Sequence, residues 1–362
     1  MTSIPSPARA AAATAAVLLL HFGLAAPSAA TGPTGTAHEA RQGHGAPLVI
    51  GHRGSAGYRP EHTAASYELA ARMGADYLEP DLVSTKDGVL VSRHENEIGQ
   101  STDVADHPAF ADRKTTKTVD GWEMTGWFTE DFTLAELKTL RAKEARPELR
   151  PANAVHDGRY PIMTFQEVVD LSRTLSRRLG RTIGVYPETK HSAYFASLGL
   201  PLEPALVRTL DANGLNRPNA KVFVQSFEVD NLRRLDAQLR VPLVQLVWSA
   251  DQVTPERLRE IAGYADAVGA EQTMVIPWRE DGTLGGPTAL VRQAHRLGLA
   301  VHVYTFAAEN EFLPAAYRSS ANPADHGRLA DELTAYFAAG VDGVFSDHVD
   351  VAVAARRAHG HR

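Results

Sequence analysis

The sequence predicts an α/β fold with a closed or doubly wound parallel sheet. Short apolar segments rich in β-branched residues recur from Pro47 onward, and helical patterns lie between many of them. Strands that are apolar almost throughout are typical of parallel sheets, because helices cover both faces of such a sheet. The chain has 362 residues, 44% of them hydrophobic, which suffices for one large domain or two small ones.

The expected strands follow from short apolar runs bounded by turn residues. Helices are expected where apolar residues recur at helical spacing, at 63–75, 164–180 and 287–298. In chain order, the expected strands are 47–51, 76–83, 89–94, 182–188, 221–227, 242–248, 265–271, 299–306 and 341–347.

The link between the strands at 76–83 and 89–94 is irregular. It consists of the segment STKDG, whereas a parallel crossover takes a dozen or more residues. The expected strands also number one more than an eight-stranded barrel holds. Either these two strands pair as a hairpin, or one of them lies outside the barrel.

The stretch from 95 to 161 is a second irregularity. It contains Trp122, Trp127 and Phe128 but no alternation of strand and helix patterns. We interpret it as an inserted segment that lies over one end of the sheet.

The first 30 residues have the order of a secretory signal peptide. Arg9 precedes a short apolar stretch, and small residues follow up to a cleavage point after Ala30. The apolar stretch is well short of the roughly 20 residues of a membrane span, which argues against an anchor. We therefore expect a secreted or extracytoplasmic protein, with a signal peptide at 1–30 and a flexible lead-in at 31–45.

Charge and composition exclude several classes of function. The formal net charge is −6 and there is no basic run, so the sequence lacks the electrostatic signature of a nucleic-acid partner. The chain has no cysteine, which excludes disulfides, thiolate metal sites and a cysteine nucleophile. It also has neither a glycine-rich phosphate loop of the nucleotide type nor a GxSxG elbow.

Ionisable residues gather at the ends of the expected strands. In a parallel barrel the carboxyl ends of the strands converge on one mouth, where catalysis occurs. Each residue could instead have a purely structural role, such as a hydrogen-bonded core histidine or an isolated salt bridge. For the whole set, however, such independent roles would all have to occur at the same end of the fold, which favours a common site. The set consists of His52, Arg53, Glu79, Asp81, His94, Glu188 and Lys190.

The chemistry of this set points to a phosphodiester. Glu79 and Asp81 lie two apart on one strand and so face the same side, where two carboxylates repel unless a cation separates them. A hard divalent cation takes oxygen ligands and would accept Glu188 as a third. Arginine, lysine and a cation together suit a phosphate, and two histidines can move protons near neutral pH. The residues therefore favour a metal-assisted phosphodiesterase.

The order of the motifs resembles the glycerophosphodiester phosphodiesterase family. The resemblance covers essentially the whole chain after residue 46, and PEHT, DFTLAELKTLR (131–141) and the insertion are similar to its exported, periplasmic-type bacterial branch. The matching motifs are HRG (52–54), PEHT (60–63), EPD (79–81), TKDG (85–88), GVYPETK (184–190), VFVQSFEVDNLRRL (222–235), VHVYTFAAEN (301–310) and GVDGVFSDHVD (340–350).

This resemblance implies a TIM-type (β/α)8 barrel over residues 46–356, with a small insertion at about 95–161 and a tail at 357–362. It implies one divalent ion, Ca²⁺ or Mg²⁺, and hydrolysis of glycerophosphodiesters such as glycerophosphocholine and glycerophosphoethanolamine to sn-glycerol 3-phosphate and an alcohol. The partner is then a small molecule, with no stable membrane insertion, and the oligomeric state stays open.

Site roles also follow from the resemblance. Glu79, Asp81 and Glu188 would hold the metal, His52 and His94 would be the acid–base pair, and Arg53 and Lys190 would hold the phosphate. Glu61 would support this set by hydrogen bonding or approach the metal. Gln225, Trp278 and Tyr304 would shape the glycerol pocket, although core packing explains Trp278 and Tyr304 equally well. The family usually has His-Asp where this chain has His94-Glu95, so Glu95 puts the proton chemistry in question.

Two other functions remain open at this point. One is a sphingomyelinase D-like or phospholipase D-like enzyme on the same barrel, with Trp122, Trp127 and Phe128 as an exposed apolar surface. The other is a secreted phosphoglycerol-binding protein in which Glu95 has abolished turnover.

Overall fold

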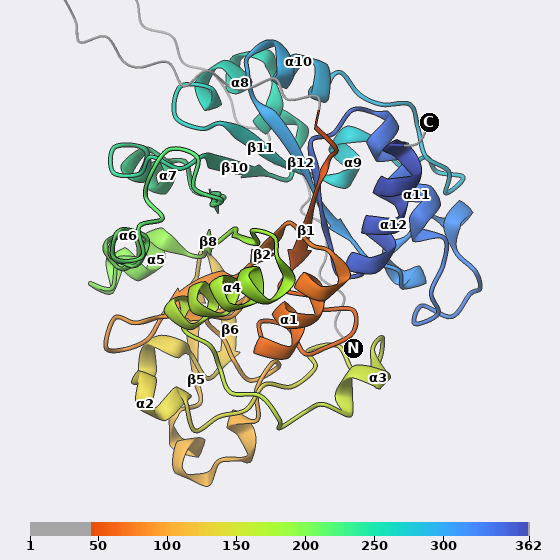
Figure 1. The fold of residues 1–362 in the computed structure, drawn as a ribbon. Helices are drawn as coiled ribbons and strands as arrows, with labels where there is room; N and C mark the ends of the chain where they lie inside the picture. The colour runs from red at the N-terminus through yellow and green to blue at the C-terminus, as the bar shows by residue number, and fades with distance from the viewer. Residues whose placement is uncertain (1–44, 361–362) are drawn as a thin grey trace, which may run out of the picture. The chain divides into compact units, whose positions relative to one another are not determined.

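The computed structural model describes residues 45–360, and within them one barrel of parallel strands surrounded by helices (Figure 1). The predicted signal peptide and all but the last residue of the predicted lead-in lie outside the described residues. The barrel sheet contains β1 (Leu48–His52), β2 (Tyr77–Glu79), β3 (Asp81–Ser84), β4 (Leu90–Ser92), β7 (Gly184–Val185), β8 (Glu188–Thr189), β9 (Val224–Ser226), β10 (Leu243–Val247), β11 (Ala267–Glu271), β12 (Ala300–Phe306) and β13 (Gly343–Ser346).

The sheet closes into a ring through two strands that are each divided into two parts. The sheet runs β4-β3-β8-β9-β10-β11-β12-β13-β1-β2-β7. β2 and β3 are consecutive parts of one chain segment, as are β7 and β8, and a parallel bridge from Val185 to Val222 continues the ring from β7 towards β9. The eleven strands therefore form an eight-stranded barrel with one additional strand, β4.

The predicted single strand at 76–83 is wrong in one respect, since Pro80 interrupts it. Pro187 interrupts the predicted strand at 182–188 in the same way. Proline has no N–H to donate, so the ladder of hydrogen bonds breaks at each of these positions. The hairpin alternative for the STKDG link is confirmed, because β4 pairs antiparallel with β3.

The helices cover the outside of the barrel (Figure 1). Thr63 caps α1 and accepts a hydrogen bond from the Ser66 N–H, while Thr164 and Glu167 form a capping box at α4. They are α1 (Ala64–Met73), α2 (Leu134–Leu137), α3 (Pro151–Ala154), α4 (Phe165–Leu179), α5 (Ser192–Ser197), α6 (Leu202–Ala212), α7 (Val229–Asp236), α8 (Pro255–Ile261), α9 (Gln272–Val275), α10 (Leu290–Arg296), α11 (Leu329–Ala338) and α12 (Val349–Gly360). α12 continues into the segment predicted as a tail.

The core occupies two spaces that the barrel strands separate. The larger cluster lies between the sheet and the helices and includes Leu78, Phe195 and Val303. A smaller cluster, which includes Ile50 and Tyr186, packs on the other side of the sheet. Alternate residues of the strands contribute to each cluster, which explains why the strand sequences are apolar almost throughout.

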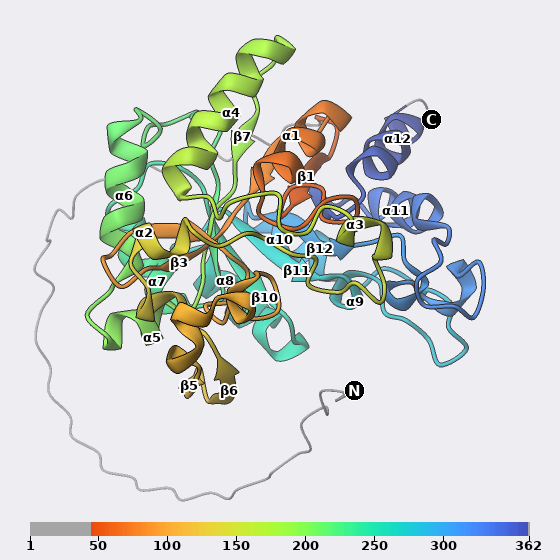
Figure 2. The same ribbon diagram turned by 90° about the horizontal axis from the view of Figure 1, so that it is seen from below.

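The stretch predicted as an insertion has little regular structure. It contains the antiparallel pair β5 (Thr115–Val119) and β6 (Trp122–Gly126), with the short helices α2 and α3. In Figure 2, β5 and β6 lie on the side of the barrel opposite α1 and α12. No helix within residues 45–360 is both long and apolar enough to cross a membrane.

Candidate active site

A cavity of about 180 Å³ lies at the carboxyl ends of β1 and β2. Every member of the ionisable set predicted at strand ends lines this cavity, and so do Gln225 and Tyr304. The full lining is His52, Arg53, Glu79, Asp81, His94, Glu188, Lys190, Gln225, Phe227, Leu246, Tyr304, Thr305 and Phe345. The barrel therefore brings residues from distant segments to one place, as expected for the mouth of a parallel barrel.

Three buried carboxylates, Glu79, Asp81 and Glu188, form one cluster in this pocket. One oxygen of each lies within 4.8 Å of the other two. Burial, together with the nearby Asp81 charge, raises the pKa of Glu188 to about 8 and that of Glu79 well above its usual value. Ionising all three is therefore costly unless a cation compensates for the charge.

Asp81 is the member of the cluster that is held ionised. Its Oδ2 lies 3.0 Å from Nε2 of the fully buried His62. Burial acts to raise the pKa of Asp81, but the hydrogen bond from His62 and the surrounding positive charges outweigh burial and hold that pKa well below its usual value. Burial lowers the pKa of His62, so this ring is neutral and its Nε2–H donates to Asp81.

The cluster fits a divalent cation. Asp81 Oδ1 is buried and has no hydrogen-bond partner among the described residues. An unpartnered buried carboxylate oxygen that faces two further carboxylates is the arrangement that a hard cation with oxygen ligands requires. Glu79 is held in place by the backbone N–H of Arg53, which donates to Oε2 at 2.7 Å, and by Gln225 Nε2, which donates to Oε1 at 3.2 Å.

His52 is oriented by two hydrogen bonds. Its Nδ1 lies 2.6 Å from Oδ1 of Asp347, and its Nε2 lies 3.3 Å from Nε of Arg53. Since a carboxylate accepts and a guanidinium donates, the neutral ring carries its proton on Nδ1 and keeps a lone pair on Nε2. The nitrogen beside Arg53 can therefore accept a proton.

His94 has the same arrangement on another strand end. Its Nδ1 lies 3.0 Å from Oε1 of Glu95, and its Nε2 lies 3.2 Å from Nζ of Lys190. Burial, with the charges of Arg53 and Lys190, lowers the pKa of His94 to about 4. The neutral ring therefore also keeps its lone pair on Nε2.

The two cations of the pocket have carboxylate partners. Arg53 Nη1 donates to Glu61 Oε2 at 2.6 Å, and Lys190 Nζ lies 3.7 Å from Glu188 Oε1. Burial acts to lower the pKa of each, but the nearby carboxylates outweigh it and raise the pKa of both groups. Arg53 and Lys190 are therefore permanent positive charges at neutral pH, available to an anionic substrate.

The remaining predicted residues fall into two groups. Glu61 and Glu95 do not line the cavity, and each instead holds a residue that does: Arg53 and His94 respectively. Trp278 is not among the residues that line the cavity, whereas Tyr304 lines it and donates its hydroxyl to the Val247 carbonyl at 2.7 Å.

Three residues that support this site were not predicted from the sequence. His62 and Asp347 both lie in motifs of the family resemblance, PEHT and SDHVD, which is the signal that could have indicated them. Arg150 donates to Asp347 and lies in the predicted insertion, where no pattern marks it.

The comparisons with known proteins point to one family. The model of the glycerophosphoryl diester phosphodiesterase family matches residues 52–351. A glycerophosphodiester phosphodiesterase of Arabidopsis thaliana is 34% identical over 327 residues, which cover 83% of this chain and 83% of that protein. One of Bacillus subtilis is 31% identical over 314 residues, covering 84% of each chain.

Solved structures share the fold at low sequence identity. A glycerophosphodiester phosphodiesterase from Agrobacterium tumefaciens has a TM-score of 0.55 at 18% identity and covers 85% of this chain and 99% of its own. An Oleispira antarctica phosphodiesterase, solved with sn-glycerol-3-phosphate, has a TM-score of 0.57 at 20% identity, covering 85% of this chain and 96% of its own. The predicted TIM-type barrel is thereby confirmed. With a family match over most of the chain and relatives above 30% identity, this chain belongs to the glycerophosphoryl diester phosphodiesterase family and is an enzyme of that class.

Proposed function

We propose that this enzyme hydrolyses glycerophosphodiesters, among them glycerophosphocholine and glycerophosphoethanolamine, to sn-glycerol 3-phosphate and an alcohol. The observation that carries the proposal is a single cavity in which His52, His94, two cationic side chains and a carboxylate cluster meet. The Oleispira antarctica structure contains sn-glycerol-3-phosphate, which supports this product.

In this proposal Glu79, Asp81 and Glu188 hold one divalent cation, Ca²⁺ or Mg²⁺. The bound cation would supply Lewis-acid stabilisation of the charge that develops on the phosphate oxygens. Arg53 and Lys190 bind the same oxygens by charge-assisted hydrogen bonds. Gln225 and Tyr304 are proposed to contact the glycerol part of the substrate.

His52 and His94 are proposed as the acid–base pair. One accepts the proton of the attacking oxygen through its unprotonated Nε2. The other, when protonated on Nε2, donates that proton to the oxygen of the leaving alcohol. The carboxylates on Nδ1, Asp347 and Glu95, stabilise each ring in its protonated form.

An enzyme that acts on intact lipids is not favoured. Of the three aromatic residues considered for an apolar surface, Trp127 and Phe128 are buried and Trp122 is exposed. The cavity of about 180 Å³ is also smaller than the ~300–1,000 Å³ of sites that enclose a drug-sized ligand. Both observations favour a small, water-soluble ester.

A binding protein without turnover is not favoured either. That alternative depends on Glu95 as a lesion, yet the Glu95 carboxylate lies 3.0 Å from Nδ1 of His94. Glu95 therefore provides His94 with a carboxylate partner on Nδ1, as the proposed acid–base role requires.

The test is release of sn-glycerol 3-phosphate from glycerophosphocholine, measured with Ca²⁺, with Mg²⁺ and with EDTA. His52→Ala should abolish release, and EDTA should abolish it in the wild type. His295→Ala is the matched control, because His295 also contacts an aspartate, Asp342, but does not line the cavity. A folded wild-type protein that releases no product with either metal would contradict the proposal, and vesicles of intact lipid would then be the next substrate.

Export through residues 1–30, as in the exported bacterial branch of the family, is also part of the proposal. Its support is the order of charge, apolar stretch and small residues in that segment. Amino-terminal sequencing of protein recovered outside the cytoplasm should begin close to Thr31. Recovery of the chain from the cytoplasm with its amino terminus intact would contradict export.

A further inference from the structure

Asp347 is the least exposed carboxylate that contacts a histidine of the cavity. It follows β13 directly, its side chain is 8% exposed, and its Oδ1 lies 2.6 Å from Nδ1 of His52. Burial acts to raise the pKa of Asp347, but the charges of Arg150 and His52 outweigh burial and hold it below its usual range. The buried, negatively charged Asp347 therefore contacts Nδ1 of His52, and Nε2 of the same ring faces the cavity.

Arg150 fixes the second oxygen of Asp347. Its Nη2 donates to Asp347 Oδ2 at 2.5 Å, its Nη1 to the Ala56 carbonyl at 3.1 Å, and its Nε to Glu309 Oε1 at 2.6 Å. The planar guanidinium thus connects the insertion, the loop after β1 and the residues that follow β12 and β13. Because both carboxylates are buried, Asp347 has no freedom to rotate away from His52.

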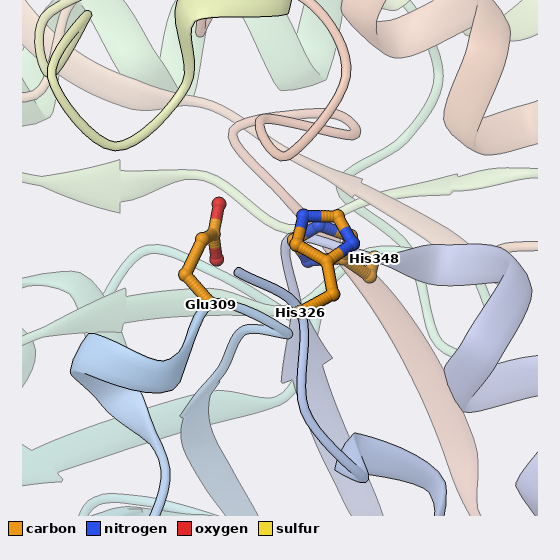
Figure 3. A group of neighbouring side chains, drawn as sticks. All are labelled: Glu309, His326 and His348. Atoms are coloured by element: carbon orange, nitrogen blue, oxygen red, sulfur yellow. The ribbon is translucent and has the colours of Figure 1, made fainter. Parts of the chain in front are cut away.

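The outer end of this network is a cluster of Glu309, His326 and His348 (Figure 3). Its donors resemble those of a metal site, but the hydrogen bonds point to another role. The Ala308 N–H donates to Nδ1 of His348 at 3.1 Å, and burial lowers the pKa of His348 to about 4. The neutral ring therefore carries its proton on Nε2 and has no lone pair there for a metal, whereas metal-bound histidines donate from the other nitrogen. We interpret the cluster as packing around Glu309, whose Oε1 accepts a hydrogen bond from Arg150 and whose backbone forms a bridge with His326.

We propose that Asp347, fixed by Arg150 and Glu309, is the positioning residue that holds His52 in the tautomer with its proton on Nδ1 and its lone pair directed to the substrate. The role in turnover rests on the proposed function; the tautomer does not. The Arg53 contact to Nε2 of His52 requires the same tautomer, so two independent hydrogen bonds agree.

The first measurement is ¹⁵N NMR of full-length protein labelled with ¹⁵N-histidine, which reports which ring nitrogens carry protons. The signals absent from His52→Ala identify His52. The wild type should show a protonated Nδ1 and an unprotonated Nε2, and Asp347→Asn should shift His52 towards the opposite tautomer or a mixture. A wild-type ring with its proton on Nε2 would overturn the proposal whether or not the protein has activity.

The second measurement is steady-state kinetics on glycerophosphocholine. Asp347→Asn should lower kcat by on the order of 10²-fold or more, towards the ~10⁴-fold loss seen when a catalytic histidine of a Ser-His-Asp triad loses its orienting carboxylate. KM should change less than about threefold, because Asp347 does not line the cavity. A variant with unchanged kcat, or with its whole loss in KM, would overturn the positioning role.

Asp342→Asn is the matched control. Asp342 precedes β13 as Asp347 follows it, and its Oδ2 lies 2.8 Å from Nε2 of His295, away from the cavity. It should leave kcat unchanged, and a loss equal to that of Asp347→Asn would assign the effect to general stability.

A triple variant, Asp347→Asn with Arg150→Gln and Glu309→Gln, covers the case in which the single variant does not fold. It removes the arginine together with both carboxylates that it joins, so no charge of this network is left without a partner, and it should fold more stably than Asp347→Asn alone. Its kcat should stay low. Recovery of wild-type kcat in the triple variant would overturn the proposal, because the tautomer would then not depend on the carboxylate.

Discussion

The two histidines of the cavity are oriented alike but supported in different surroundings. Each has a carboxylate on Nδ1 and a cationic donor on Nε2. For His52 the carboxylate is 8% exposed and is itself held by an arginine that is 11% exposed, whereas for His94 it is Glu95, which is 38% exposed. The same orientation is thus obtained once by a fixed internal network and once by contacts near solvent.

The difference indicates which carboxylate can be varied. Glu95 also contacts His191, whose Nδ1 contacts Asp120 beside β5. An extra methylene at residue 95 is accommodated because this side is partly open. Asp347 lies between His52 and Arg150 at contact distance on both sides, so a change of one methylene there would displace the ring.

The largest effect is expected from removing either ring. His52→Ala and His94→Ala should each lower kcat by on the order of 10²–10⁴-fold, because proton transfer to or from the reacting oxygens is lost. The measurement is kcat at saturating glycerophosphocholine, and circular dichroism checks that each variant is folded. Near-normal turnover in either variant would show that His52 and His94 do not act as an acid–base pair.

The next largest effect is expected on protein stability, which should fall more when Asp347 is removed than when Glu95 is removed. Asp347→Ala leaves the mostly covered Arg150 with one partner fewer, and the loss of one member of a buried pair costs about 3–5 kcal/mol of unfolding free energy. Glu95→Ala should cost less than ~1 kcal/mol, as for ion pairs near the surface. Urea unfolding at pH 7 measures both, and equal losses would remove the distinction between a buried and an open side.

A smaller effect on turnover is expected from Glu95→Gln. Solvent can replace part of the lost charge near His94, so kcat should fall by about tenfold rather than ~100-fold or more. Glu95→Asp keeps the negative charge, shortens the side chain by one methylene and should stay within about threefold of the wild type. A loss of kcat in Glu95→Gln as large as that in Asp347→Asn would mean that the partly exposed Glu95 matters to His94 as much as the buried Asp347 matters to His52.

The smallest effect is the dependence of protein stability on pH, which should have opposite signs for His191, beside Glu95, and for Asp347. Burial acts to lower the pKa of His191, but hydrogen bonds to Asp120 and Glu95 outweigh it and raise that pKa from 6.5 to about 9, against the opposing charge of Lys190. The group therefore stabilises the fold fully below about pH 6.5 and loses this contribution as the pH rises through about 9. Asp347, with a lowered pKa, instead loses its contribution as the pH falls below its unfolded value of 3.8.

Urea unfolding of the wild type and His191→Asn at pH 6 and pH 10 tests this sign. His191→Asn should cost about 1 kcal/mol at pH 6, since Asp120 and Glu95 are partly exposed, and almost nothing at pH 10. Glu228 also faces His191, and burial raises the pKa of its carboxyl group. A cost that grows with pH would contradict the assignment.

The contrast also shows what the sequence could predict. Residues at strand ends, such as His52, Glu79 and His94, are marked by the local change from apolar to ionisable types, and the barrel rule places them together. The breaks at Pro80 and Pro187 fall inside apolar runs that otherwise have the pattern of single strands. The two runs pair in the same register before and after the breaks, so the prolines, which have no N–H, are the signal in the sequence that divides them.

Contacts between distant segments were not predictable in the same way. Asp347 lies 295 residues from His52, and Arg150 lies 197 residues from Asp347. A single sequence does not indicate which of many aspartates or arginines meets a given histidine, because that depends on how the insertion packs on the loops of the barrel. His62 had a motif but no predicted role, since its partner Asp81 is 19 residues away on another element.

The separation of 295 residues between His52 and Asp347 has a consequence for biosynthesis. A ribosome delivers His52 with the first barrel strand and Asp347 just after the last. A nascent chain that ends before β13 has already received Glu79, Asp81 and Glu188 but has no group to orient His52. Under the proposed role of Asp347, catalytic competence arises only when the ring closes, so a chain truncated before β13 should lack activity although it contains the whole carboxylate cluster.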